Sequence, residues 1–131
     1  MRPRFRPGEA VWVELCTPDP EQAEAFYGAL LGWTVRAERL GATTYRMCSI
    51  DGRDVAGISD ATTLRGGRPR GWLTYFAVDD VAASARQAVT LGGELVSPPR
   101  YLPAAGTGAA VIDPFGAAFG LYQGEIGRAH V

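Results

Sequence analysis

Apolar and polar residues alternate along Val11–Cys16, a spacing of two that predicts a strand. Val13 and Leu15 share one face of this strand, and Trp12 and Glu14 share the other face with Cys16. After Pro18 the spacing changes to that of a helix, with a stripe of apolar residues at Ala23, Phe26, Tyr27, Leu30 and Leu31. We expect this stripe to cover the face of Val13 and Leu15. On that assumption, truncating Phe26 to alanine would cost about 3–5 kcal/mol.

The predicted helix carries start and stop signals. Asp19 suits the N-cap, Pro20 suits the first helical position, and Gly32 suits the left-handed residue that ends a helix. A degenerate copy of the whole stretch returns 61 positions later, where Asp80 matches Asp19 and Gly93 matches Gly32. The chain is therefore expected to use one structural unit twice.

Turn residues delimit the remaining strands. Asp51-Gly52 between two strand-like segments is a strong hairpin signal, and Asp113-Pro114-Phe115-Gly116 suits a type I turn. Pro98–Thr107 carries three prolines and is expected to be a loop. The predicted fold is α+β, with one β-α-β-β-β module at about residues 9–60, a linker at 61–70 and a second module at about 71–124.

Composition excludes several classes of function. The chain has 131 residues and a net charge of −1, which gives no sign of nucleic acid as a partner. No apolar run reaches the length of a membrane span, and no secretory signal is visible, so we expect a cytoplasmic protein with no membrane partner. Cys16 and Cys48 are then expected to be reduced thiols. Glu125–Val131 does not fit the pattern and is expected to be a non-native tail, which matters because it holds the sole histidine, His130.

Several motifs together resemble those of a known family. They are the helix end FYGALLGW, the strand motifs WVELCTPD, DGRDVAGI and WLTYFAVDD, and the hairpin DPFGAAFGLYQ. The resemblance is to the vicinal oxygen chelate superfamily, which includes glyoxalases, bleomycin-resistance proteins and dioxygenases, and it covers about residues 8–124. It implies two modules whose strands curl around a shared cleft, with the helices outside. It also implies a subgroup with two such domains in tandem, so the expected protein partner is a second domain of this kind or a second copy in a homodimer.

The same resemblance identifies the positions that hold a metal ion in related proteins. The four positions correspond here to Trp12, Gly57, Leu73 and Gly120. None of these residues offers the imidazole, carboxylate or thiolate that a divalent ion requires. We therefore expect no specific metal site and no cofactor.

Strand parity places a set of residues on the face toward the expected cleft, where an apolar, aromatic concavity would suit a small-molecule ligand. These residues are Trp12, Glu14, Gly57, Leu73, Tyr75, Gly120 and Tyr122. The two glycines would let a ligand approach the backbone. Glu14 is the candidate acid/base residue or cation anchor, and its repeat equivalent, Tyr75, could donate a hydrogen bond to it. The alternative is that Glu14 lies at the rim, hydrated or paired with an arginine.

Three functions remain open at this point. The chain could be a metal-free protein that binds a small, cationic or aromatic molecule, as drug-resistance members of the superfamily do. It could instead be a metal-independent isomerase or lyase in which Glu14 transfers a proton. A third possibility is that the chain is the structural half of a tandem protein. No motif for nucleophilic catalysis or phosphate binding is present.

Overall fold

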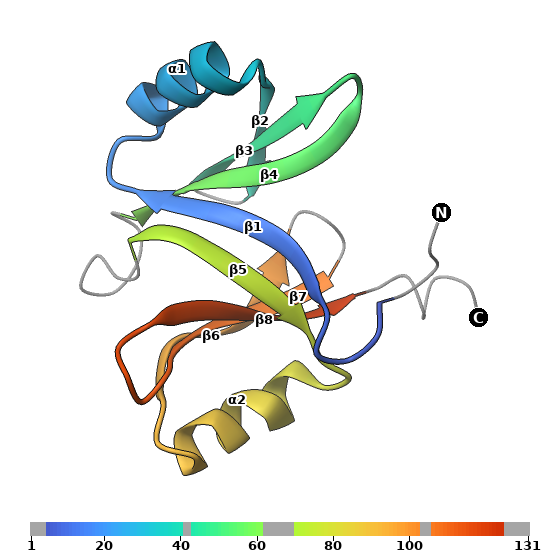
Figure 1. The fold of residues 1–131 in the computed structure, drawn as a ribbon, viewed down its shortest axis with the longest axis vertical. Helices are drawn as coiled ribbons and strands as arrows, with labels where there is room; N and C mark the ends of the chain where they lie inside the picture. The colour runs from blue at the N-terminus through green and yellow to red at the C-terminus, as the bar shows by residue number, and fades with distance from the viewer. Residues whose placement is uncertain (1–4, 41–42, 62–69, 103–105, 125–131) are drawn as a thin grey trace. The chain divides into compact units, whose positions relative to one another are not determined.

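The computed structural model describes residues 5–40, 43–61, 70–102 and 106–124 (Figure 1). The predicted linker at 62–69 and the predicted tail lie outside these residues. The elements follow the order β1 (Ala10–Thr17), α1 (Pro20–Leu31), β2 (Thr34–Leu40), β3 (Thr43–Ile50) and β4 (Arg53–Asp60), and then β5 (Gly71–Ala77), α2 (Val81–Thr90), β6 (Glu94–Leu102), β7 (Gly106–Ile112) and β8 (Ala118–Gly124). The predicted α+β class and the repeated β-α-β-β-β order are confirmed.

The chain divides into two compact units. The first unit spans Trp12–Leu73, and the second combines Met1–Val11 with Thr74–Val131. In the first unit the strands lie in the order β2-β3-β4-β1, with β1 parallel to β4 and the other neighbours antiparallel. In the second unit the order β5-β8-β7-β6 repeats this arrangement. The shared cleft that the resemblance implies concerns both units and stays a prediction.

In the first unit the capping and turn residues have the predicted roles, whereas after α2 the left-handed residue is Gly92, with φ 102°, and not Gly93. The carboxylate of Asp19 accepts a hydrogen bond from the Gln22 backbone N–H at 3.1 Å, and Gly32 ends α1 with φ 72°. At the β3–β4 hairpin, Asp51 and Gly52 have φ values of 50° and 80°, the two positive values that a type I′ turn requires. These local signals therefore fix where the elements of the first unit begin and end.

The helix face predicted for α1 is only partly correct. Ala23 belongs to the buried core with Leu15 and Ile58, and Tyr27 packs against that core. Phe26 is 59% exposed, and Leu30 and Leu31 are also exposed. Ala23 and Tyr27 lie four residues apart and form the row that faces the sheet, whereas Phe26 and Leu30 form the next row on the helix surface. The expected cavity cost for Phe26→Ala is thus wrong, because this ring is not part of the core.

One predicted loop is a strand. β6 extends through Pro98 and Pro99 as far as Leu102. The backbone nitrogen of proline cannot donate a hydrogen bond to a neighbouring strand, but prolines are tolerated at bulges and in edge strands. The register with β7 shifts on both sides of Ser97, and β6 is the last strand of its unit. The irregular pairing therefore accommodates the prolines that led us to expect a loop.

Candidate functional site

A buried carboxylate is the centre of the candidate site in the first unit. β1 and β4 run parallel with Glu14 opposite Gly57, and the Glu14 side chain is 0% exposed. Apart from the buried tyrosines and cysteines, the only other buried polar or charged side chain among the described residues is Ser97, which lies in the second unit. A carboxylate taken from water is costly unless hydrogen-bond donors replace the water. The side chains around Glu14 therefore determine which chemistry its carboxylate can perform.

Three side chains donate to this carboxylate. The Tyr45 hydroxyl donates to Glu14 Oε1 at 3.0 Å, and the Ser59 hydroxyl donates to Glu14 Oε2 at 2.9 Å. The Cys16 thiol makes a longer contact with Glu14 Oε2, at 3.7 Å. The Ser59 hydroxyl also lies 3.5 Å from Cys16 Sγ. Glu14 therefore sits in a connected hydrogen-bond network with no exposure to solvent, which does not fit a hydrated rim position.

The network extends from Glu14 toward a half-buried aromatic residue. The indole N–H of Trp12 donates to the Tyr45 hydroxyl oxygen at 3.2 Å. Tyr45 accepts from Trp12 and donates to Glu14, so the phenol links the indole to the carboxylate. Chains of hydrogen bonds of this kind fix the direction of each donor. We call Trp12, Glu14, Cys16, Tyr45 and Ser59 the Glu14 cluster.

Gly57 has a different role from the predicted one. A Cβ atom at Gly57 would clash with the ring and hydroxyl of Tyr45. The space above this glycine is thus taken by Tyr45, not left open for a ligand at the backbone. In the second unit Gly120 lies opposite Tyr75, and a Cβ atom there would clash with the Tyr75 ring. Both last-strand glycines make room for a tyrosine.

The other predicted site residues fall in two places. Leu73 is buried and belongs to the first unit, together with Trp12, Glu14 and Gly57. Tyr75, Gly120 and Tyr122 are buried in the second unit, where Tyr122 makes an edge contact with Phe5 at a centroid distance of 6.4 Å. The structure thus brings Trp12, Glu14 and Gly57 together, and the hydrogen bond from Tyr75 to Glu14 stays a prediction.

Sequence reasoning missed Tyr45 and Ser59. Ser59 lies two residues after Gly57 on the same strand, so strand parity could have placed it on the same face as the glycine. Tyr45 could not be found in this way, because its position depends on the β3–β4 register, in which Met47 lies opposite Gly57. A glycine inside a strand marks a close approach, and the approaching group is this phenol.

The residues at the family's four metal positions do not fit a metal ion. The Trp12 nitrogen is a donor and is used on Tyr45, Gly57 has no side chain, and Leu73 and Gly120 carry no donor atoms. Among the described residues no group of three or more histidine, cysteine or acidic side chains has metal-binding geometry.

The two thiols are both buried and neither forms a disulfide, but their surroundings differ. Cys16 belongs to the Glu14 cluster, whereas Cys48 is 0% exposed in the apolar core of the first unit. Burial raises the pKa of the Cys48 thiol to about 11, and the charge of Glu24 adds to the effect. Cys48 is therefore a neutral core residue and is not suited to nucleophilic chemistry.

The sequence profile of the Glyoxalase/Bleomycin resistance protein/Dioxygenase superfamily matches residues 10–121. The chain belongs to this superfamily. Among curated relatives, "Putative glyoxylase CFP32" of Mycobacterium tuberculosis is 37% identical over 128 residues, covering 93% of this chain and 48% of the relative. The "Anthracycline biosynthesis protein DnrV" of Streptomyces peucetius is 35% identical over 133 residues, covering 92% and 48%. The chain spans about half the length of the curated relatives it matches.

Solved structures confirm the fold. A methylmalonyl-CoA epimerase in complex with methylmalonyl-CoA and NH4+ has a TM-score of 0.61 at 18% identity, covering 91% of this chain and 96% of that one. The methylmalonyl-CoA epimerase of Mycobacterium tuberculosis has a TM-score of 0.59 at 17% identity, covering 94% and 92%. In the described part of the chain, neither helix has the length and hydrophobicity needed to cross a membrane.

Proposed function

We propose that this chain binds a small molecule at the Glu14 cluster, and that the ligand donates hydrogen bonds or carries a positive charge. The observation that carries the proposal is the position of Glu14, fully buried and held by Tyr45 and Ser59. A protein that needed only a stable strand here could use an apolar residue, because burying a carboxylate costs free energy even when it is paired. The cost is consistent with a role for the charge.

The chemistry of the cluster defines the class of ligand. A carboxylate accepts hydrogen bonds only, and the Tyr45 hydroxyl, once it donates to Glu14, offers its oxygen as an acceptor as well. The Trp12 indole already uses this acceptor, which shows that an N–H group can reach it. Amines and protonated nitrogen compounds can donate hydrogen bonds to such acceptors. A quaternary ammonium group would be attracted by the charge of the carboxylate and by cation–π contact with the Trp12 ring.

A metal-independent enzyme is the second candidate. Three groups that can carry a proton, from Tyr45, Ser59 and Cys16, lie in direct contact with the Glu14 carboxylate. In an isomerase or lyase the Glu14 carboxylate would take a proton from the substrate. The hydroxyl groups of Tyr45 and Ser59 would hold the carboxylate in position. The name of the mycobacterial relative, which calls it a glyoxylase, is compatible with this candidate. An activity that withstands chelators and is lost in Glu14→Gln would select it over simple binding.

The third candidate is that the chain forms the structural half of a longer protein. The curated relatives are about twice the length matched here, which supports a second tandem domain as the partner, and a homodimer would supply an equivalent unit. We propose a cytoplasmic setting because neither Cys16 nor Cys48 forms a disulfide. We propose no resident cofactor because the residues at the four metal positions of the family do not fit a metal ion.

Ligand identification tests the proposal. The protein is isolated from its native host under native conditions, and bound small molecules are identified by mass spectrometry. The proposal predicts one equivalent of a nitrogen-containing ligand that wild-type protein retains and that Glu14→Gln loses. Retention of the same ligand at the same occupancy by a folded Glu14→Gln protein would contradict it.

A further inference from the structure

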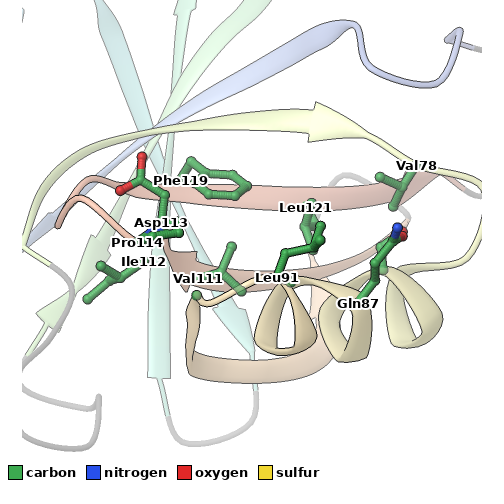
Figure 2. Close-up of a pocket in the computed structure, with 12 residues that line it drawn as sticks. Val78, Gln87, Leu91, Val111, Ile112, Asp113, Pro114, Phe119 and Leu121 are labelled. Atoms are coloured by element: carbon green, nitrogen blue, oxygen red, sulfur yellow. The ribbon is translucent and has the colours of Figure 1, made fainter.

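The second unit contains an apolar cavity, whereas the Glu14 cluster belongs to the first unit. It lies between α2 and the strands β7 and β8 and has a volume of about 310 Å³ (Figure 2). Its walls include Val111, Phe119 and Leu121 on the sheet side, and Ala88 and Leu91 on the helix side. Leu91 is 68% exposed, so the cavity opens to solvent beside this residue. A volume of this size is at the lower end of the range for small-molecule sites.

The cavity has a cause in the sequence of α2. This helix, VAASARQAVT, presents alanines to the sheet, with Ala85 in the buried core and Ala88 packed beside it. Protein interiors are otherwise filled at the density of organic crystals, so short side chains facing a sheet leave space. Water in such a space would find few hydrogen-bond partners, which favours an apolar occupant.

The first unit shows what can occupy the matching space. By the 61-residue repeat, Ala88 corresponds to Tyr27. Tyr27 packs against the core of the first unit, and its ring stacks on Trp33 with a centroid distance of 5.8 Å. Its hydroxyl accepts a hydrogen bond from the Trp72 indole at 3.1 Å. The same module of this fold thus accepts a phenol ring between helix and sheet.

Phe119 places an aromatic ring on the sheet side of the cavity, opposite α2, but does not fill the cavity. Phe119 lies opposite Val111 on the β7–β8 ladder, at the place that Ala56 takes opposite Cys48 in the first unit. The Phe119 ring makes an edge contact with Phe76 at 6.0 Å. The cavity remains beside it and gains an aromatic wall against which a second ring can pack.

We propose that this cavity binds a neutral, phenol-like aromatic ring. The apolar walls would hold the ring, and the Gln87 amide on the α2 side could serve the ligand's hydroxyl group, as Trp72 serves Tyr27 (Figure 2). The acidic side chain at the edge, Asp113, already accepts hydrogen bonds from the backbone N–H groups of Phe115 and Ala117 at 2.8 and 2.9 Å. The site therefore selects an uncharged ligand, in contrast to the Glu14 cluster.

The test uses phenol itself as the probe. Phenol is titrated into the full chain with ¹³C-labelled methyl groups, and the methyl signals of Val111, Leu121 and Leu91 are followed. We expect saturable shifts at these signals and none at Ile58, which lies in the core of the first unit. No saturable shift up to the solubility limit of phenol would overturn the proposal.

Matched variants on α2 decide where phenol binds. Ala88→Tyr supplies the residue that the first unit uses and should fill the cavity, so the shifts should disappear while the melting temperature is kept or raised. Ala82→Tyr adds the same side chain at an exposed position of the same helix and should leave the shifts unchanged. Ala88→Leu replaces Ala88→Tyr if the larger side chain prevents folding. Shifts that persist in a folded cavity-filling variant would overturn the proposal.

A second copy of the chain is the competing occupant. Phe115 is 92% exposed on the turn next to the cavity, and an exposed ring beside an apolar cavity could pair two copies symmetrically. In that case the cavity signals would move with protein concentration in the absence of phenol, and Phe115→Ser would abolish the movement. This result would overturn the ligand proposal, whereas signals that are independent of concentration support it.

Discussion

The Tyr45 hydroxyl lies 3.0 Å from Glu14 Oε1 and stands directly over Gly57, the residue that pairs with Glu14 on the neighbouring strand. A tyrosine, a carboxylate and a glycine on three adjacent strands are thus fitted to one another. The glycine provides the space, the phenol fills it, and the carboxylate fixes the direction of the phenol O–H group. This relationship underlies the first prediction.

Gly57→Ala should displace Tyr45 and break its hydrogen bond to Glu14. The new methyl group clashes with the phenol, and the carboxylate then loses a donor, which together should lower the free energy of unfolding by about 2–4 kcal/mol. Urea melts measure the change. If the mechanism is correct, the cost of Gly57→Ala falls sharply in a Tyr45→Ala background, because the clash is absent there. Simple additivity of the two costs would contradict it.

Tyr45→Phe should destabilise the protein without creating a clash. It removes one donor to Glu14 Oε1 and the acceptor of the Trp12 N–H, and losing a hydrogen bond to a buried polar group costs about 1–3 kcal/mol. Tyr27→Phe is the matched control, because the Tyr27 hydroxyl accepts its hydrogen bond from Trp72, which is 39% exposed. Equal and small effects in both variants would mean that the buried network contributes no stability.

Phe26→Ala should change the free energy of unfolding by no more than about 0.5 kcal/mol, since surface substitutions rarely do more. Ile58→Ala, at a fully buried position of the same unit, should cost about 2–5 kcal/mol. Denaturant melts of both variants check the assignment of the α1 face. A cost for Phe26→Ala as large as that for Ile58→Ala would restore the inward orientation expected from the sequence.

Stability should fall between about pH 9 and pH 11 because of Cys48. The pKa of this thiol rises from 9.0 to about 11 on folding, so above pH 9 the unfolded chain loses a proton that the folded chain still holds. The folded state then binds more protons than the unfolded state, and the free energy of unfolding decreases as the pH rises. Thermal melts across this range should show the decrease in wild type and a smaller one in Cys48→Ala. Identical pH profiles of wild type and Cys48→Ala would contradict the raised pKa of the Cys48 thiol.

Local signals in the sequence predicted most of the fold, and tertiary relationships explain what they could not predict. Caps and tight turns depend on local backbone geometry and not on long-range contacts. The roles of Asp19, Gly32 and Asp51-Gly52 could therefore be predicted from the sequence. The exposure of Phe26 depends on which of two adjacent apolar rows of α1 meets the sheet. Residue type alone cannot distinguish these rows.

The sequence predicted only part of the candidate site. Strand parity placed Trp12 and Glu14 on one face, and the structure keeps them within one network. Tyr45 joins them through the register of β3 against β4, which the hydrophobic pattern does not specify to the residue. Gly57 was singled out as a place where a ligand could approach the backbone, but the group that lies against it is the Tyr45 ring.

Calorimetry on the ligand identified from native protein is the most direct test of the Glu14 cluster as a binding site. Wild type is compared with Glu14→Gln, which keeps the shape of the side chain, and with Glu21→Gln, which removes an equal charge from an exposed position on α1. All three proteins are first shown to be folded by circular dichroism. The account predicts unchanged affinity for Glu21→Gln and a loss of at least about tenfold for Glu14→Gln, as expected when a buried charge loses its role in binding. Equal affinity of all three proteins would show that Glu14 serves the fold alone.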